Sequence, residues 1–230
     1  MTPKIFAIAD LHLPGGEPDK GMEVFGPHWQ GHWDKIQADW RARVSPEDTV
    51  VIPGDISWAM TLPAALEDLQ SIGALPGKKL LLRGNHDYWW SSIGRVRDTL
   101  PAGMYALQND CIAIDGTVYC GTRGWVLPQR PDFGPHDQTI YAREVARLRL
   151  SLQDAARKHK DVSPRVLMHF PPLVDSPTDF TALFAEFGVT KVVYGHLHGS
   201  PTPPPVQGTV DGVEYLCAAC DQLRFRLAEW

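Results

Sequence analysis

The sequence contains no long hydrophobic run. No apolar segment approaches the roughly 20 residues that a membrane-spanning helix requires. The N-terminal stretch KIFAIAD ends in a carboxylate, and it lacks the apolar core and the small-residue cleavage site of a secretory leader. These absences argue against a membrane partner and against export, so we expect a cytoplasmic protein.

Cysteine is also scarce, with four residues in a chain of 230, too few for a disulfide framework. Cys217 and Cys220 have the spacing of half a redox or zinc site, but their small apolar neighbours and the single copy favour a buried strand. A two-residue hairpin loop at 115–116 would place Cys111 opposite Cys120. In a reducing cytoplasm we expect both of these thiols to be free.

Basic charge is not in excess. The chain has 22 Lys and Arg against 27 Asp and Glu, a net charge of −5, so we expect no broad basic face for duplex nucleic acid. It also has no internal repeat and no long low-complexity segment. A hydrophobic content of 43% is enough for a sizeable core, and we expect one domain over residues 1–230.

Several short apolar runs are typical of strands that are buried on both faces. They are Ile5–Ala9, Val50–Ile52, Lys79–Leu82, Arg165–Met168 and Lys191–Tyr194. Apolar stripes of helical period lie between them, at 33–44, 62–72, 141–155 and 180–187, with Thr61 as an N-cap and Gly73 and Gly188 as stop signals. Asp-Gly pairs at 115–116 and 211–212 predict hairpins. The whole pattern predicts a layered α/β fold with mixed sheets.

Side chains that can bind metal follow each of these strands. In chain order they are Asp10 and His12, then Asp55, then Asn85 with His86 and Asp87, then His169, and then His196 with His198. Ligands of open α/β sheets bind at the carboxyl ends of the strands, so these groups are expected to converge. Extended backbone would direct both members of each D-x-H or H-x-H pair to the same face.

Any one of these residues could have a structural role, since a strand-end Asp often caps a turn and a single His is often hydrogen-bonded in the core. Five coincidences favour metal binding, because so many polar groups at one edge are costly without a cation. The candidate ligands are Asp10, His12, Asp55, Asn85, His169, His196 and His198. This set exceeds one tetrahedral zinc and suits two divalent or trivalent ions, with Mn favoured and Fe or Zn as alternatives.

The ordered motifs D-x-H, G-D, G-N-H-D, a single H and G-H-x-H resemble the signature of the calcineurin-like metallophosphoesterases. They span residues 10–198, and the stretches GDISWAM and GNHDYWW are similar to those of an uncharacterised bacterial branch of that superfamily. The resemblance implies an α/β sandwich of two mixed β-sheets flanked by helices, with four layers in the order α/β/β/α.

The resemblance also implies a role for each motif residue. One metal would be bound by Asp10, His12 and His198, the second by Asn85, His169 and His196, and Asp55 would bridge both. A hydroxide between the metals would attack phosphorus. His86 would not bind metal but would protonate the leaving oxygen. Asp87 would either orient His86 or hold the loop, and we favour the loop.

One departure from the pattern bears on the substrate. Protein serine/threonine phosphatases of this superfamily extend the second motif to G-D-x-x-D-R-G, and here Trp58 and Ala59 replace that acid and that arginine. A monoester dianion gains more from an arginine fork than a diester monoanion does. We therefore favour small phosphodiesters, including cyclic or small nucleotides, as partners. The alternatives are a phosphomonoesterase acting on a nucleotide or sugar phosphate, and a non-catalytic binding scaffold, which the complete ligand set disfavours.

Aromatic and basic residues near the motifs have two interpretations. Trp29 and Trp33 alternate with histidines that include His32. They either pack in the core or form a rim of the active site on which a nucleobase would stack, and we favour the core. Arg123 is within possible reach of a phosphate, but a structural role is favoured.

Overall fold

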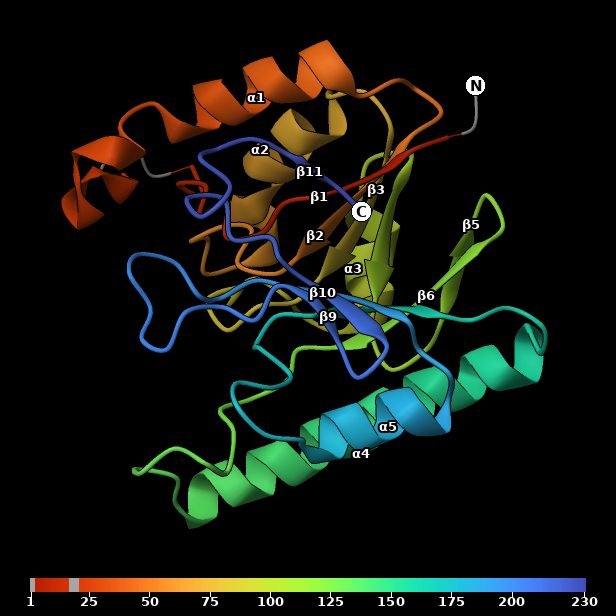
Figure 1. The fold of residues 1–230 in the computed structure, drawn as a ribbon. Helices are drawn as coiled ribbons and strands as arrows, with labels where there is room; N and C mark the ends of the chain where they lie inside the picture. Colours follow the sequence, from red (N-terminus) through yellow and green to blue (C-terminus); the bar gives the residue numbers. More distant parts are fainter. Residues whose placement is uncertain (1–2, 17–20) are drawn as a thin grey trace.

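The computed structural model describes residues 3–16 and 21–230. Figure 1 shows two β-sheets packed face to face, with helices on the outer face of each sheet. The predicted four-layer sandwich is therefore confirmed. It forms because most strands are apolar on both faces and must be covered on both sides.

The first sheet has the strand order β11-β1-β2-β3-β4. Strands β1 to β4 run parallel, and β11 pairs with β1 in the antiparallel direction. Helices α1, α2 and α3 cover the outer face of this sheet. The elements are β1 (Ile5–Ala7), α1 (His32–Arg43), β2 (Thr49–Pro53), α2 (Leu62–Gly73), β3 (Lys78–Leu82), α3 (Ile93–Thr99), β4 (Met104–Leu107) and β11 (Ala228–Glu229), and two short 3-10 helices, η1 (Met22–Phe25) and η2 (Pro27–Trp29), precede α1.

The second sheet has the strand order β5-β6-β7-β8-β10-β9. Its four inner strands are parallel, and the two edge strands β5 and β9 are antiparallel to their neighbours. Helices α4 and α5 cover its outer face. The elements are β5 (Ile112–Ile114), β6 (Thr117–Thr122), α4 (Pro135–Lys158), β7 (Arg165–Met168), α5 (Asp179–Glu186), β8 (Lys191–Tyr194), β9 (Gly208–Val210) and β10 (Val213–Cys217).

Alternate residues of each strand face different layers of the core, as extended backbone requires. In β2, Val50 packs with the helices and Val51 packs between the two sheets. In β8, Val192 packs against α4 and α5, and Val193 joins the layer between the sheets. All four side chains are fully buried, so both sheets are anchored through both faces.

The predicted strands are confirmed with small shifts at their ends. The last two, Arg165–Met168 and Lys191–Tyr194, have the predicted bounds. The first strand ends at Ala7, earlier than predicted, although the N–H groups of Ile8 and Ala9 still donate to the carbonyl oxygens of Val51 and Ala218.

The predicted helices are also present. At the start of α2 the Thr61 hydroxyl accepts a hydrogen bond from the Ala64 N–H, which confirms the predicted N-cap. Gly73, which the sequence suggested as a stop signal, is the last residue of α2. Gly188 follows α5 with a φ of 64°, the conformation in which glycine ends a helix at lowest cost.

Both predicted hairpins form at the Asp-Gly pairs. Asp115 and Gly116 have φ values of 49° and 82°, and residues 211–212 have similar positive values. Two successive positive φ angles are the signature of a type I′ turn, which Asp-Gly favours. The register pairs Ile114 with Thr117, as predicted, and Ile112 with Tyr119, and Cys111 directly precedes the first paired residue of β5.

The cysteines are free and buried, as expected. Burial raises the pKa of Cys120 to about 12 and that of Cys217 to about 12. A buried thiol with a raised pKa is a poor nucleophile. Cys217 ends β10, and the Cys220 thiol donates to the backbone oxygen of Asp10, so this pair belongs to the core and not to a redox motif.

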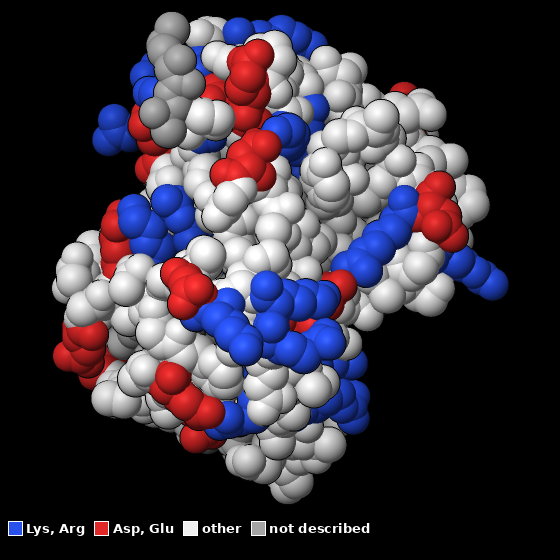
Figure 2. Space-filling view, turned by 90° about the vertical axis from the view of Figure 1, so that its right-hand side faces the viewer, with Lys and Arg blue, Asp and Glu red and all other residues white. Residues whose placement is uncertain are grey.

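No helix in the described part of the chain is both long and apolar enough to cross a membrane. Figure 2 shows one face of the molecule, on which Lys and Arg side chains are interspersed with Asp and Glu side chains. The basic side chains gather most densely in the lower half of this view.

Candidate metal centre

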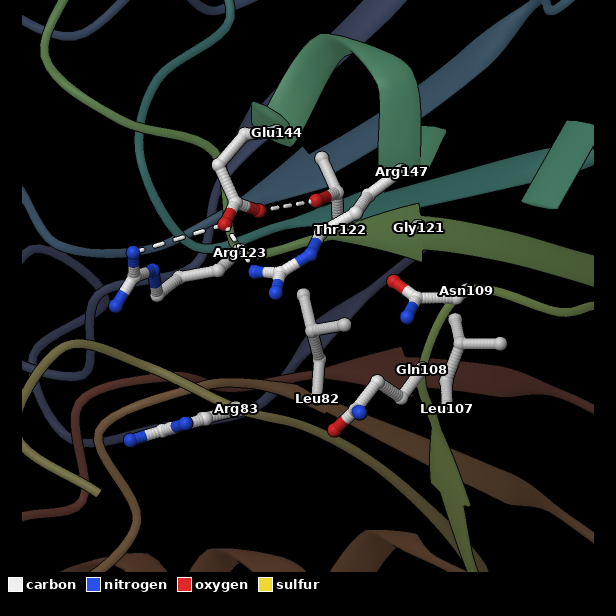
Figure 3. A pocket seen from close by; sticks show the side chains of 10 residues that line it. All are labelled: Leu82, Arg83, Leu107, Gln108, Asn109, Gly121, Thr122, Arg123, Glu144 and Arg147. Carbon is white, nitrogen blue, oxygen red and sulfur yellow. Dashed lines mark hydrogen bonds and ion pairs between the residues drawn. The ribbon is translucent and has the colours of Figure 1, made fainter. Parts of the chain in front are cut away.

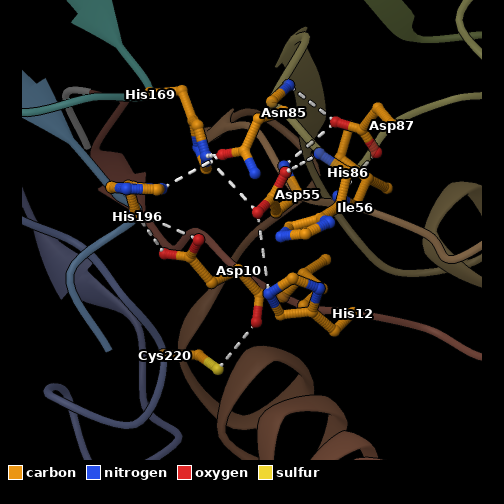
Figure 4. A network of polar contacts seen from close by, with 12 residues as sticks. Asp10, His12, Asp55, Ile56, Asn85, His86, Asp87, His169, His196 and Cys220 are labelled. Carbon is orange, nitrogen blue, oxygen red and sulfur yellow. Dashed lines mark hydrogen bonds and ion pairs between the residues drawn. The ribbon is translucent and has the colours of Figure 1, made fainter. Parts of the chain in front are cut away.

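Two clusters of side chains that could hold a metal ion lie at the carboxyl ends of the strands. Figure 4 labels their members except His198. In each cluster the potential ligand atoms lie within 4.8 Å of one another. The first consists of Asp10, His12 and His198, and the second of Asp55, His169 and His196. Parallel strands of both sheets end here, which is why residues far apart in the sequence meet at one edge.

Asp55 belongs to the second cluster and also lies close to the first. Its Oδ2 atom is 3.3 Å from Nε2 of His169 in the second cluster and 3.7 Å from Nε2 of His12 in the first. Its other oxygen, Oδ1, accepts a hydrogen bond from the His86 N–H at 2.8 Å. The carboxylate is therefore held in one orientation, with Oδ2 directed at both groups of imidazoles.

Asn85 joins the second cluster. Its side-chain oxygen lies 2.7 Å from Nε2 of His169 and 3.1 Å from Nδ1 of His196. Nδ1 of His169 is 3.0 Å from the Pro53 carbonyl oxygen, which orients that ring from behind. An imidazole whose other nitrogen contacts a backbone carbonyl presents its Nε2 lone pair to a cation.

Left-handed backbone conformations are concentrated at these residues. Asp10, His12, Asp55 and His196 have φ angles of 58°, 44°, 53° and 69°. Each non-glycine residue in this region costs about 1 kcal/mol or more, and such residues persist where the surroundings over-determine them. The strain arises because the chain turns sharply at the end of each of these strands. The same turns direct the side chains into the site.

Two motif glycines are required by close approach. A Cβ atom on Gly84 would lie 2.1 Å from Oδ1 of Asp55. A Cβ atom on Gly195 would lie 2.8 Å from Oδ2 of Asp10 and 2.7 Å from the side chain of Ala9. These glycines let the second-cluster loops pack directly against the carboxylates.

The unpaired atoms of the site fit metal ions. Among the described residues, both ring nitrogens of His12 and Oδ2 of Asp55 are buried without a hydrogen-bond partner. Buried polar atoms are rarely left unpaired in folded proteins. Carboxylate, amide and imidazole groups without sulfur form a donor set for ions such as Mn²⁺, Fe²⁺ or Zn²⁺.

The protonation states also favour cation binding. Burial lowers the pKa of His12 to about 3, and burial with the nearby charge of His169 lowers that of His196 to about 3, so both imidazoles are neutral near pH 7. Burial would raise the pKa of Asp55, but the charge and close contact of His169, together with the charge of His12 and the hydrogen bond from the His86 N–H, hold the pKa below its usual value. His12 and His196 are therefore in the form that binds metal, beside an ionised carboxylate. Burial would lower the pKa of His169, but the charge of Asp55 raises it to about 9, so this imidazole has to release a proton when a cation binds.

His86 lies next to the clusters without belonging to either. Its ring centroid is 5.7 Å from that of His12 and 4.7 Å from that of Trp58. Trp58 in turn stacks on His12 at 4.6 Å with an angle of 21° between the planes. The sequence identifies Trp58 only as the replacement for an acid, whereas in the structure its ring packs against both the candidate ligand His12 and His86.

Asp87 holds the loop, as the sequence favoured. It is fully buried, and its oxygens accept hydrogen bonds from four backbone N–H groups and from the Trp89 indole. The four backbone donors are Gly84, Asp55, Ile56 and Ser57. Asp87 therefore ties the loop that carries Asn85 to the segment that carries Asp55.

We predict that Asp87→Asn lowers the free energy of unfolding by about 3 kcal/mol, because an amide offers one acceptor oxygen to five N–H donors. Urea unfolding followed by circular dichroism measures this difference. Asp98→Asn is the matched control, since Asp98 is exposed on α3. Equal stability of the two variants would contradict the structural role of Asp87.

Trp29, His32 and Trp33, which the sequence suggested as a possible substrate rim, have partners within the protein. Trp29 is buried and packs against Phe225 and His32, and the Nε2 atom of His32 contacts the Leu11 carbonyl oxygen. The indole N–H of Trp33 donates to the Ser71 hydroxyl. All three therefore have structural partners, in agreement with core packing.

A large pocket opens beside His196. Its volume is about 540 Å³, and apolar and aromatic side chains contribute most of its walls. Trp125 and Phe170 stand at the end nearest the site, where the ring of Phe170 lies 4.1 Å from that of His196. The sequence has no local signal for this pocket, because its walls come from loops that are distant in the chain.

Comparisons with known proteins agree with this geometry. Residues 3–200 match the profile of a family described as calcineurin-like phosphoesterase. None of the curated proteins matches the chain.

Similar folds occur among solved structures. Phosphopantetheinyl hydrolase from Mycobacterium tuberculosis is 16% identical with a TM-score of 0.60, over 99% of this chain and 95% of that one. TT1561 of Thermus thermophilus is 10% identical with a TM-score of 0.60, over 100% and 99% of the two chains. A protein of unknown function from Aquifex aeolicus is 15% identical with a TM-score of 0.55, over 99% and 96%. At these identities the likeness concerns the fold.

Proposed function

Because the chain belongs to the calcineurin-like phosphoesterase family, we propose that it is a metal-dependent phosphoesterase that hydrolyses small phosphate esters. One observation carries the proposal: Asp55 of the second cluster lies 3.7 Å from His12 of the first, and a histidine outside both clusters lies beside them. This arrangement would provide two cation sites and a separate proton donor.

The side chains would hold two cations as follows. Asp10, His12 and His198 would hold one, Asn85, His169 and His196 would hold the other, and Asp55 would contact both. Mn²⁺ is our first choice, with Fe or Zn as alternatives, because the donors are oxygen and imidazole nitrogen. When bound, a pair of such cations supplies positive charge to phosphoryl oxygens and acidifies a water molecule.

His86 would act as the general acid. A ring nitrogen of His86 would donate a proton to the oxygen that leaves phosphorus. Trp58 limits the movement of this ring on one side, and Asp55 accepts a hydrogen bond from its backbone N–H. The loop is further held by Asp87, so the donor is positioned before the substrate binds.

The pocket beside His196 would receive the organic part of the ester. A volume of about 540 Å³ is within the range of pockets that bind small molecules. The faces of Trp125 and Phe170 suit a flat group such as a nucleobase or a phenyl ring. One structural neighbour is named a phosphopantetheinyl hydrolase, and that name is compatible with this assignment.

Phosphodiesters are the favoured substrates. Trp58 and Ala59 occupy the positions where the related monoester phosphatases carry an acid and an arginine. Trp58 is engaged in stacking on His12, and the Ala59 side chain is buried. Neither residue offers a cation to the second charge of a monoester dianion.

We predict that the Mn²⁺-loaded protein hydrolyses bis(p-nitrophenyl) phosphate with at least about tenfold higher kcat/KM than p-nitrophenyl phosphate. The two esters share one leaving group, so the comparison reports on the charge at phosphorus. Release of nitrophenolate measures both rates under matched metal conditions.

A higher kcat/KM for the monoester would reverse this ranking and would assign a phosphomonoesterase. Absence of turnover of either ester by a metal-loaded sample would instead favour a binding scaffold. A panel with cyclic nucleotides would then extend whichever class is active.

A further inference from the structure

A second cavity lies near the candidate metal centre, at the seam between the two sheets (Figure 3). Strands β3, β4 and β6 end at this cavity. The residues that follow them, Arg83, residues 108–109 and Arg123, line its wall. Helix α4 closes the cavity with Glu144 and Arg147. The cavity therefore belongs to the same edge of the sandwich as the ligand clusters, and it collects three guanidinium groups against one carboxylate.

Glu144 positions two of these arginines. Its side chain is 1% exposed and accepts a hydrogen bond from Nη1 of Arg147 at 2.6 Å and one from the Thr122 hydroxyl at 2.5 Å. Nη2 of Arg123 lies 3.6 Å from the same carboxylate. The Arg123 guanidinium also stacks over Trp125 at 4.8 Å. These contacts hold the two guanidinium groups in defined places.

The positive charge of the cavity is not balanced. Within residues 3–16 and 21–230, Arg83 has no carboxylate at ion-pair distance, and the buried Nε atoms of Arg83 and Arg123 have no hydrogen-bond partner. Burial lowers the pKa of the Arg123 guanidinium, Glu144 opposes this effect, and the charges of Arg83 and Arg147 add to it. A buried donor without an acceptor is costly, and a bound anion would supply the acceptor.

Arg83 and Arg123 both lie next to candidate ligands, Arg83 along the chain and Arg123 through backbone hydrogen bonds. Only Gly84 separates Arg83 from Asn85. The backbone oxygen of Arg123 accepts hydrogen bonds from the N–H groups of His169, at 3.1 Å, and Phe170, at 2.9 Å. In Figure 3 the side chains of Arg83 and Arg123 extend in the same direction, beyond the end of β6.

We propose that this cavity binds a second phosphate group of the substrate, distinct from the phosphate that is hydrolysed. The inference rests on the proposed function, since it assigns the substrate class of that same site. The substrate would be a phosphodiester that carries an additional phosphomonoester, such as a nucleotide ester with a phosphate on another sugar hydroxyl. Guanidinium forks match the oxygens of a phosphate dianion in both charge and geometry.

The size of the cavity agrees with this ligand. Its volume of about 70 Å³ holds about five water-sized groups at 10–15 Å³ each. A phosphate group has one phosphorus and four oxygens. The organic part of the ester would remain in the larger pocket at Trp125 and Phe170, because that pocket adjoins His196.

Two chromogenic diesters test the inference. They are the p-nitrophenyl esters of thymidine 5′-phosphate, one with and one without a phosphate on the 3′ oxygen. We expect the 3′-phosphate to raise kcat/KM of the wild-type protein by about 10- to 100-fold, through charge-assisted hydrogen bonds. In Arg83→Gln this ratio should fall below about threefold, because the substitution removes the charge that has no partner.

Arg95→Gln is the matched control, since Arg95 is exposed on α3 outside the cavity, and it should keep the wild-type ratio. An equal loss on both diesters in Arg83→Gln would overturn the inference and would place Arg83 on the reacting phosphate. A wild-type ratio near one, or an unchanged ratio in Arg83→Gln, would also overturn it.

A binding measurement separates this inference from the proposed function. Inorganic phosphate is titrated into the full-length protein with ¹⁵N-labelled arginine, and the side-chain Nε–H signals are recorded. We expect the signals of Arg83 and Arg123 to shift. In Arg83→Gln, the phosphate concentration that gives half of the shift at Arg123 should rise by about tenfold or more. If neither diester is hydrolysed, the proposed function fails, and the presence or absence of these shifts still supports or overturns the phosphate site.

Discussion

Asp55→Asn is expected to abolish most of the activity and to reduce the metal content at both sites. The carboxylate oxygen Oδ2 lies within 3.7 Å of imidazoles from both clusters, so its loss affects two cations rather than one. The substitution also removes the negative charge that offsets two dications. We expect kcat to fall on the order of 10³-fold or more.

Elemental analysis of the purified variant, together with rates on bis(p-nitrophenyl) phosphate, measures both effects. His198→Gln is the matched comparison, because His198 belongs to the first cluster alone. Asp55→Asn should lose metal from both sites, and His198→Gln should retain close to one equivalent. If Asp55→Asn kept two equivalents of metal and near-normal rates, Asp55 would not be a shared ligand.

His86→Ala is expected to reduce turnover in a manner that depends on the leaving group. An alkoxide from a sugar or nucleoside leaves poorly and needs a proton in the transition state, and nitrophenolate leaves without one. General acid catalysis contributes ~10²–10⁴-fold, so we expect a loss of that size for alkyl esters and less than about tenfold for nitrophenyl esters. Metal content should remain at two equivalents, because His86 lies outside both clusters.

Paired rates on an alkyl and a nitrophenyl ester, with metal analysis of the same sample, test this assignment. His136→Ala is a suitable control, since His136 is exposed in the first turn of α4 and remote from the motifs in the sequence. Loss of metal from His86→Ala would make this residue a ligand. An equal loss on both ester classes would remove it from protonation of the leaving group.

Local patterns in the sequence were sufficient for much of the fold. Apolar runs such as Val50–Ile52 can be buried only between layers, and each Asp-Gly pair admits the two positive φ angles of a tight hairpin. The candidate ligands were also readable, because polar groups directly after buried strands must meet at the carboxyl edge of a parallel sheet. Both kinds of information are local, since each depends on residues within one turn or one strand.

Other features had no local signal. Helix α3 and strand β4 were not predicted, because Ile93–Thr99 is short and Met104–Leu107 gains its strand character from pairing with β3. The five donors that surround Asp87 come from two segments that are about 30 residues apart. In the sequence, Trp58 only replaces an acid of the related phosphatases. Its stacking on His12, which places it at the site, is visible only in the structure.

The sequence by itself determined a layered α/β fold, the positions of most strands and the seven candidate ligands, because hydrophobic periodicity and strand direction act residue by residue. The order of the four layers and the separate role of His86 were implied by the family resemblance. Only the tertiary structure shows how closely these groups meet, with Oδ2 of Asp55 3.3 Å from Nε2 of His169 and 3.7 Å from Nε2 of His12. It also decided that Arg83, Arg123 and Arg147 surround one cavity, since these residues come from two sheets and a helix. Such a juxtaposition depends on how the layers pack, and packing is set by contacts between residues that the sequence order does not relate.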